Sequence, residues 1–179
     1  MAGALVVYES VFGDAKLIAM AVAHGLCTRL PVDVACAREA PTLVSADVRL
    51  LVVGGPAHAF GMPRPAPRED AARRHLAVVP DPGFGLHEWL DSVKLPRGID
   101  AAAFDTRMDS PALLTKPDHA ARTEETLLRR LGATLAAPAE HFLVTDVAGP
   151  LVDGEEERAR RWGQALAELV APHAIPVRG

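Results

Sequence analysis

The sequence is poor in several features that define particular classes of protein. Its 179 residues include two cysteines, Cys27 and Cys36, which are too few for a disulfide framework and lack the spacing of a metal site. No apolar stretch reaches the roughly 18 residues that a membrane span needs. The formal net charge of −4 gives no basic field that would attract nucleic acid. We therefore expect neither a disulfide scaffold, nor a membrane span, nor a nucleic-acid partner.

Catalytic and targeting motifs are also scarce. The seven histidines are scattered, and none pairs with another at the spacing of metal ligands. Ser10 does not stand in a Gly-x-Ser-x-Gly nucleophile elbow. The N-terminus lacks the basic region of a signal peptide, so the cytoplasm is the expected compartment. The length, with 49% hydrophobic and 23% charged residues, predicts a single domain over residues 1–179.

The chain does contain a regular alternation of short apolar runs and helical patterns. Strands are predicted at residues 4–8, 32–37, 48–55, 100–106 and 141–147. Helices are predicted at residues 14–29, 67–79, 87–93, 118–131 and 154–171. The run over 48–55 is almost wholly apolar, which is typical of a parallel strand covered on both faces. This alternation predicts a three-layer α/β sandwich with a parallel sheet.

Three loops follow the carboxyl ends of the predicted strands, where ligands bind in such sheets. They comprise residues 9–15, 54–64 and 105–117. The second loop, GGPAHAFGMPRP, holds three glycines and three prolines, which permit close backbone approach and fix the loop shape. Its Phe60 is an aromatic that would stack on a flat ring if exposed, and the alternative is that Phe60 and Met62 pack into the protein.

Four segments together resemble the flavodoxin-like family, in particular single-domain flavodoxins of the actinobacterial type. They are VVYESVFGDAK, VVGGPAHAFGMPRP, AAAFDTRM and FLVTDVAGPLVDGEEERARRWG, and they span nearly the whole chain in order. The resemblance implies a five-stranded parallel sheet in the order 2-1-3-4-5. It also implies FMN bound without a covalent bond, with electrons passed to a redox partner protein or a small-molecule acceptor.

The family's phosphate loop reads hydroxyl-x-hydroxyl-Gly-Asn-hydroxyl, and this chain departs from it. Ser10 and Gly13 match, whereas Phe12 and Ala15 replace two hydroxyls and Asp14 replaces the asparagine. Main-chain N–H groups survive these changes, but a carboxylate near a phosphate repels it. Asp14 has an alternative role as the N-cap of the helix that follows. The loop is thus predicted to be a degenerate FMN phosphate site.

The resemblance carries the cofactor over to three groups of residues, while no catalytic and no metal-binding residue is predicted. The predicted FMN-binding positions are Ser10, Val11, Phe12, Gly13, Asp14, Ala15, Pro56, Ala57, His58, Ala59, Phe60, Gly61, Phe104, Asp105 and Thr106. Family members place tryptophan or tyrosine against the flavin ring, but Tyr8 lies inside the first strand, and Trp89 and Trp162 are predicted to be packing residues. Asp105 and Thr106 are expected at the pyrimidine side of the flavin, unless Thr106 only caps its strand.

Three classes of function stay open at this point. The first is a small FMN electron carrier or a flavin reductase component. The second is an NAD(P)H:quinone oxidoreductase, which Ser10 to Gly13 and the pair Phe60-Gly61 resemble, although the long insertion of that group is missing. The third is a flavin-free binding or regulatory module on the same scaffold. The charges of Glu155 to Glu157 and of the arginines that follow are predicted to form a solvated helix face.

Overall fold

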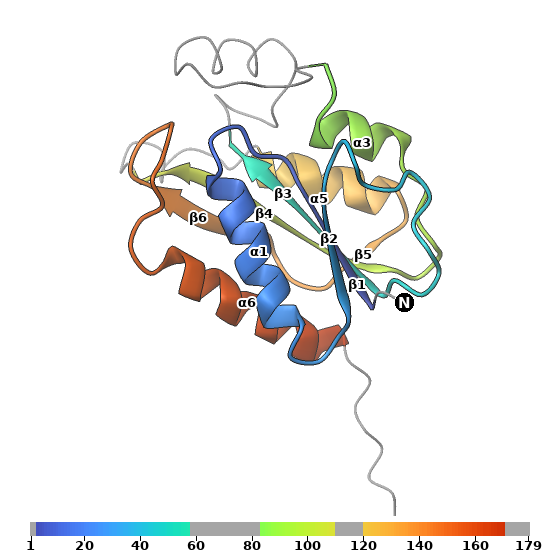
Figure 1. Ribbon diagram of the computed structural model, residues 1–179. Coiled ribbons are helices and arrows are strands. Elements are labelled where there is room, and N and C mark those ends of the chain that lie inside the picture. The colour runs from blue at the N-terminus through green and yellow to red at the C-terminus, as the bar shows by residue number, and fades with distance from the viewer. Residues whose placement is uncertain (1–2, 58–82, 110–119, 171–179) are drawn as a thin grey trace, which may run out of the picture.

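A parallel β-sheet forms the middle layer of the molecule (Figure 1). The computed structural model describes residues 3–57, 83–109 and 120–170. Strands β2 (Val32–Cys36), β1 (Ala4–Tyr8), β3 (Leu50–Pro56) and β4 (Asp100–Met108) lie side by side in that order. Beyond β4 lie β5 (Thr134–Leu135) and β6 (Glu140–Val144), both parallel to it. The predicted three-layer architecture and strand order are confirmed.

The predicted number of five strands is wrong by one, because the last strand is divided. β5 pairs with the start of β4, and β6 pairs with its end. Between the pairs Ala101↔Leu135 and Phe104↔Glu140, β4 advances by three residues and the edge segment by five. The extra residues include Pro138, which cannot donate to a strand ladder and is tolerated at a sheet edge.

Two pairs of helices cover the faces of the sheet. Helices α1 (Asp14–Leu26) and α6 (Glu155–Val170) lie together on one face, and α3 (Leu86–Ser92) and α5 (Ala120–Arg130) lie on the other (Figure 1). α1 stops before the predicted residue 29, because a turn leads from Cys27 to Pro31. The helix predicted at 67–79 lies outside the described residues. In the described part of the chain, no helix is both long and apolar enough to cross a bilayer.

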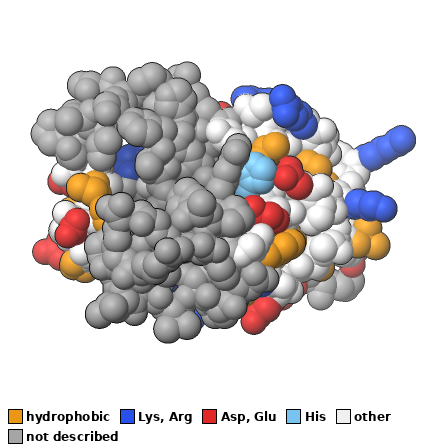
Figure 2. All heavy atoms as spheres, turned by 90° about the horizontal axis from the view of Figure 1, so that it is seen from above, with side chains coloured by type: hydrophobic (Ala, Val, Ile, Leu, Met, Phe, Trp, Pro, Cys, Tyr) orange, Lys and Arg blue, Asp and Glu red, His pale blue; other side chains and the backbone are white. Residues whose placement is uncertain are grey.

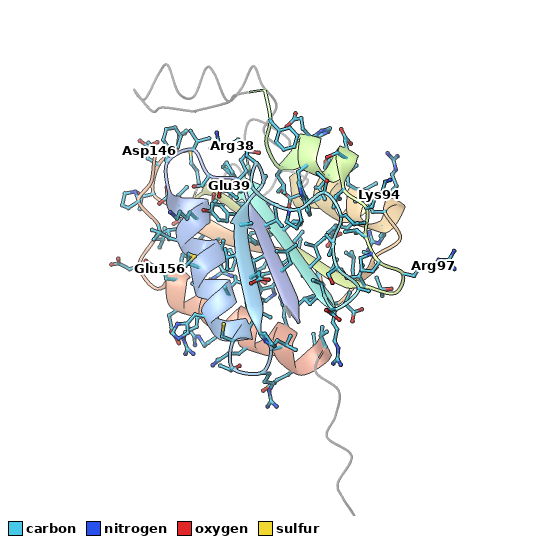
Figure 3. All side chains as sticks on the ribbon, turned by 45° about the vertical axis from the view of Figure 1, so that its right-hand side comes forward. Arg38, Glu39, Lys94, Arg97, Asp146 and Glu156 are labelled. Carbon is cyan, nitrogen blue, oxygen red and sulfur yellow. The ribbon has the colours of Figure 1, made fainter. Side chains whose placement is uncertain are left out.

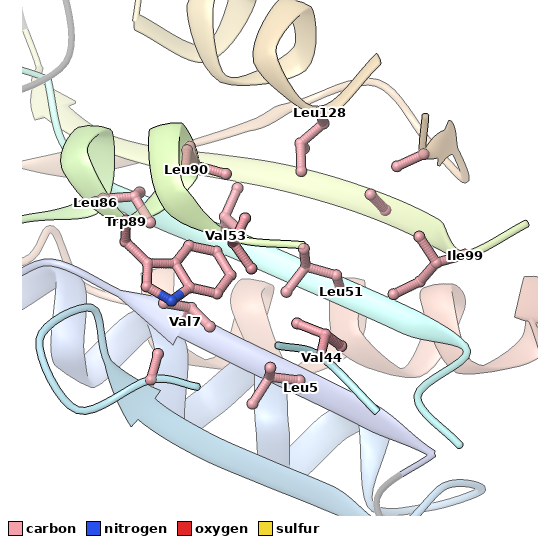
Figure 4. Close-up of a cluster of buried hydrophobic side chains, with 14 of the residues drawn as sticks. Leu5, Val7, Val44, Leu51, Val53, Leu86, Trp89, Leu90, Ile99 and Leu128 are labelled. Carbon is pink, nitrogen blue, oxygen red and sulfur yellow. The ribbon is translucent and has the colours of Figure 1, made fainter. Parts of the chain in front are cut away.

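The strands bury alternate side chains in two separate cores, as their period of two requires. Leu51 and Val53 of β3 face α3 and α5, whereas Leu50 and Val52 face α1 and α6. Trp89 fills the first core between α3 and the sheet (Figure 4), and its indole N–H donates to the carbonyl of Pro41 at 3.3 Å. The packing role predicted for Trp89 is therefore confirmed.

Helices α1 and α6 touch through their main chains at two glycines. A Cβ built at Gly25 of α1 would overlap the carbonyl oxygen of Arg160, and one built at Gly163 of α6 would overlap that of Val22. Both glycines therefore serve a close helix–helix approach that a larger residue would prevent. This contact fixes the position of α1, whose first turn borders the candidate site.

The α1–α6 contact predicts that replacing a helix glycine by alanine, which normally stabilises a protein, destabilises this one. Replacing glycine by alanine inside a helix normally adds up to about 1 kcal/mol of stability. We expect Gly163→Ala to lower the free energy of unfolding instead, by about 2 kcal/mol, because overpacking costs about 1–3 kcal/mol. Urea denaturation measures the change. Ala165→Gly, the reverse change at an exposed position of α6, is the control and should lose only about 1 kcal/mol. A stabilised Gly163→Ala variant would contradict the contact.

Candidate functional site

The carboxyl ends of β1, β3, β4 and β6 meet at one edge of the sheet and are joined there by main-chain hydrogen bonds. The N–H of Glu9 donates to Gly54 at 2.9 Å, and that of Ala57 donates to Thr106 at 2.9 Å. In Figure 3, Arg38 and Glu39, which follow β2, and Asp146, which follows β6, lie at this same end of the molecule. The predicted loops after β1, β3 and β4 therefore start side by side.

The loop between β1 and α1 closes on itself around Ser10. The Ser10 hydroxyl accepts a hydrogen bond from the N–H of Gly13 at 3.0 Å. Gly13 has a φ of 106°, a left-handed conformation that glycine adopts at little cost, and it is the N-cap of α1. No side chain caps the helix at this residue, and a Cβ built on Gly13 would meet no described residue within 4 Å. Among residues 3–57, 83–109 and 120–170, none therefore packs against this position.

Asp14 is the first residue of α1, so the alternative that it is the N-cap is wrong. Its carboxylate packs so closely on Gly149, in the turn that follows β6, that a Cβ there would overlap its oxygens. Burial raises the pKa of the Asp14 carboxyl, and the nearby main-chain N–H groups of Asp14 itself and of Leu151 act in the opposite direction.

Glu9 anchors the other end of the same loop. This carboxylate is only 8% exposed and accepts a hydrogen bond from the N–H of Leu86, the first residue of α3, at 2.8 Å. A Cβ built on Gly55 would lie 3.4 Å from the Glu9 Cβ, which is an ordinary contact. Glu9 was not predicted as a site residue. Its position in the sequence could have identified it. A carboxylate that directly follows a buried strand needs hydrogen-bond donors at the carboxyl edge of the sheet.

The three positions predicted at the end of β4 have separate environments. Phe104 is fully buried, and its ring covers Gly54 and meets Phe142 and Trp162 edge to face, with centroids 6.0 and 6.5 Å apart. The packing role predicted for Trp162 is therefore confirmed. Thr106 is 5% exposed, and its carbonyl binds the N–H of Ala57. Contact of these residues with a cofactor stays a prediction.

Asp105 belongs to a buried ionic group on the face covered by α5. Its carboxylate binds Arg107 through both oxygens, at 3.0 and 2.6 Å, and lies 3.0 Å from Nδ1 of His141. The Asp105 side chain is 1% exposed, that of Arg107 15% and that of His141 32%. Both carboxylate oxygens thus have partners within the protein, which the sequence did not predict because His141 lies on a neighbouring strand.

The remaining predicted positions are divided by the limits of the described structure. Pro56 ends β3 and Ala57 follows it, both half-buried. His58, Ala59, Phe60 and Gly61 lie outside the described residues. No group of three His, Cys, Asp or Glu in the described ranges is placed to hold a metal ion. Seen from above (Figure 2), acidic and hydrophobic side chains intermix on the described surface, and the most prominent Lys and Arg side chains project at its margin.

The turn that joins β6 to α6, residues 145–154, is held by Glu155 and Arg158. Glu155 is 8% exposed and accepts from the N–H of Leu143 at 2.7 Å and from Arg158 at 2.6 Å. Arg158 also binds Glu140 and the carbonyl of His141, and it lies 4.4 Å above the Phe142 ring. The prediction of a solvated helix face is therefore wrong for Glu155 and Arg158, which face inward.

The comparisons with known proteins concern the fold. No protein-family model and no curated protein matches the sequence. A flavodoxin from the domain Archaea is 22% identical, with 93% of this chain and 97% of that one covered and a TM-score of 0.62. Oxidised flavodoxin 1 from Bacillus cereus is 14% identical, with 92% and 97% covered and a TM-score of 0.62. The Flv1 flavodiiron core from Synechocystis sp. PCC6803 is 14% identical, with 93% and 35% covered and a TM-score of 0.61.

These likenesses define the class of structure. The chain has the flavodoxin-like fold, as its sequence predicts, and its strands β1, β3 and β4 end at the edge at which such sheets bind ligands.

Glu155 generates a prediction about stability in acid. Although burial raises the pKa of this carboxyl, the bonds from Arg158 and from the N–H of Leu143 hold it below the usual value. Its stabilising contribution is therefore present above the unfolded-state pKa and is lost as the pH falls through the lowered folded-state pKa. We expect Glu155→Gln to lose about 1–2 kcal/mol of unfolding free energy at pH 7, because charge-assisted bonds are replaced by neutral ones.

Urea titrations between pH 3 and pH 7 check this expectation, and the loss should shrink toward the acid end. Glu156→Gln is the matched control. Glu156 is exposed, and this substitution removes the same charge from the same helix turn. An equal effect of both substitutions would show that the inward bonds of Glu155 do not stabilise the turn.

Proposed function

We propose that this chain binds FMN noncovalently at the carboxyl end of its sheet and exchanges electrons with a redox partner protein or a small-molecule acceptor. The observation that carries the proposal is the start of α1, where Gly13 turns the chain into the helix without a side-chain cap and with no described residue within 4 Å of a Cβ built on it. The likeness of the fold to flavodoxins supports the choice of ligand. FMN, when bound, supplies the redox chemistry.

The residues present fit a phosphate held by the main chain. The first N–H groups of a helix have no partner within it and attract anions, helped by the helix dipole. In α1 the N–H of Asp14 lies beside its own carboxylate, so we assign the N–H groups of Ala15 and Lys16 to the phosphate. Ser10 positions the loop by accepting from Gly13. Because two of the family's three hydroxyls are missing, the phosphate is bound weakly.

Two anchors keep this cradle in shape. Glu9 binds the N–H of Leu86 at the start of α3, and the Asp14 carboxylate packs against Gly149 in the turn after β6. Neither contact involves the N–H groups assigned to the phosphate. The loop is thus fixed before the ligand arrives, which reduces the ordering cost of binding.

The proposal predicts a modest preference for FMN over riboflavin, which lacks the phosphate. We expect FMN to bind about 5- to 100-fold more tightly, equivalent to about 1–2.7 kcal/mol. Quenching of flavin fluorescence during titration of the apoprotein measures both affinities. Absence of binding by either flavin would refute the proposal and favour a flavin-free module. Equal affinities would show that the loop does not hold the phosphate.

A second prediction concerns the hydroxyl that shapes the loop. We expect Ser10→Ala to weaken FMN binding about 3- to 10-fold, because the Gly13 N–H loses its acceptor and a hydrogen bond contributes about 1 kcal/mol. Riboflavin binding should change little. Ser45→Ala removes a similar bond to the N–H of Asp47 in an exposed loop elsewhere, and it should leave both affinities unchanged. A proportional loss for FMN and riboflavin would show that Ser10 acts on the whole fold.

A further inference from the structure

Asp14 places a fixed carboxylate on the helix turn assigned to the phosphate. Its oxygens lie against Gly149, where a built Cβ would be only 2.5 and 2.8 Å from them, and the N–H of Leu151 is nearby. Rotation toward solvent would remove the carboxylate from this packed position. A bound phosphate would therefore meet a negative charge that cannot easily move away.

The charged groups on the neighbouring elements give Asp14 little compensation. It forms no ion pair within residues 3–57, 83–109 and 120–170, and Lys16 on its own helix is exposed. The turn after β6 adds two exposed acids, Asp146 and Asp153. At the start of α6, the cation of Arg158 is engaged by Glu155 and Glu140.

Glu9 adds a further carboxylate at the other end of the loop, buried and bound to Leu86. The surroundings of the proposed phosphate site are thus predominantly acidic, and main-chain N–H groups are its principal source of positive potential.

A phosphate monoester carries between one and two negative charges near neutral pH, because its second pKa is about 6. The doubly charged form suits a site rich in cations. At a site that already holds a carboxylate, binding one proton lowers the combined negative charge of the phosphate and the carboxylate, and the site therefore favours it. The half-buried position of Asp14 acts in the same direction, since burial raises the pKa of its carboxyl. A proton from solvent can therefore settle on either group.

Resting on the proposed function, we propose that FMN binding at this loop takes up one proton from solvent, shared between the phosphate and Asp14. FMN consequently binds more tightly at pH 5 than at pH 8. Linkage sets the limit of the effect at about tenfold in affinity per pH unit for one proton. The site thus prefers a singly charged phosphate.

Titrations of the apoprotein with FMN and riboflavin at pH 5, 6, 7 and 8 test this inference. We expect the FMN affinity to rise about 10-fold or more from pH 8 to pH 5, while the riboflavin affinity stays constant within about 2-fold. Calorimetry at pH 7 in two buffers of different ionisation enthalpy should give a net uptake of protons with FMN and none with riboflavin.

Substitutions assign the effect to Asp14. Asp14→Asn keeps the size and shape of the side chain that packs on Gly149 and removes its charge. It should strengthen FMN binding at pH 8 by about 5- to 30-fold and reduce the pH dependence to under about 3-fold. Asp153→Asn removes an equal charge from the nearby turn and should behave as the parent chain does. The wild-type comparison of FMN with riboflavin stands without any variant, should Asp14→Asn disturb folding.

The outcomes separate this inference from the proposed function. FMN affinity that is constant from pH 5 to pH 8, or a pH dependence shared by riboflavin, overturns the proton uptake and leaves FMN binding intact. A pH dependence that persists in Asp14→Asn overturns the role of Asp14. Failure of both flavins to bind at every pH overturns the proposed function, and the inference with it.

Discussion

Direct contact between the main chains of α1 and α6 sets the geometry on which the candidate site depends. At Gly25 and Gly163 the two helices approach closely enough to exclude a Cβ, so neither can slide or rotate freely against the other. At the opposite end of α1, Asp14 packs against Gly149 in the turn that leads into α6. The first turn of α1 is consequently held at a defined place, next to a loop whose start is bonded to the end of β3.

The loop before α1 combines order with electrostatic conflict. Glu9 binds the N–H of Leu86 and Asp14 packs on Gly149, so the loop contacts two different elements through carboxylates. The same carboxylates place negative charge where an anion is proposed to bind. A fold of this kind can therefore keep the shape of a phosphate loop while its preference among phosphate charge states changes, because the main chain supplies the donors and the side chains adjust the potential.

The alternation of strands and helices could be predicted from the sequence because it depends on local patterns of apolar residues. The strand order followed from resemblance, and the loops at the carboxyl edge followed from the topology. The roles of particular polar residues depend on contacts that are remote in sequence. Aspartate at a helix start is typical of an N-cap, but the Asp14 carboxylate packs on Gly149, which follows the last strand. Glu155 has the local pattern of a solvated acid, but it binds Leu143. No local pattern identifies the acceptor that a distant N–H requires.

The division of the last strand into β5 and β6 has a consequence for the molecule's behaviour in a crowded solution. A continuous edge strand presents an unbroken row of unpaired main-chain groups, on which another chain can add a strand of its own. Here the row is interrupted by the additional residues around Pro138, and each fragment is short, with two residues in β5 and five in β6. The division of the last strand into β5 and β6 therefore protects this edge of the sheet from edge-to-edge aggregation.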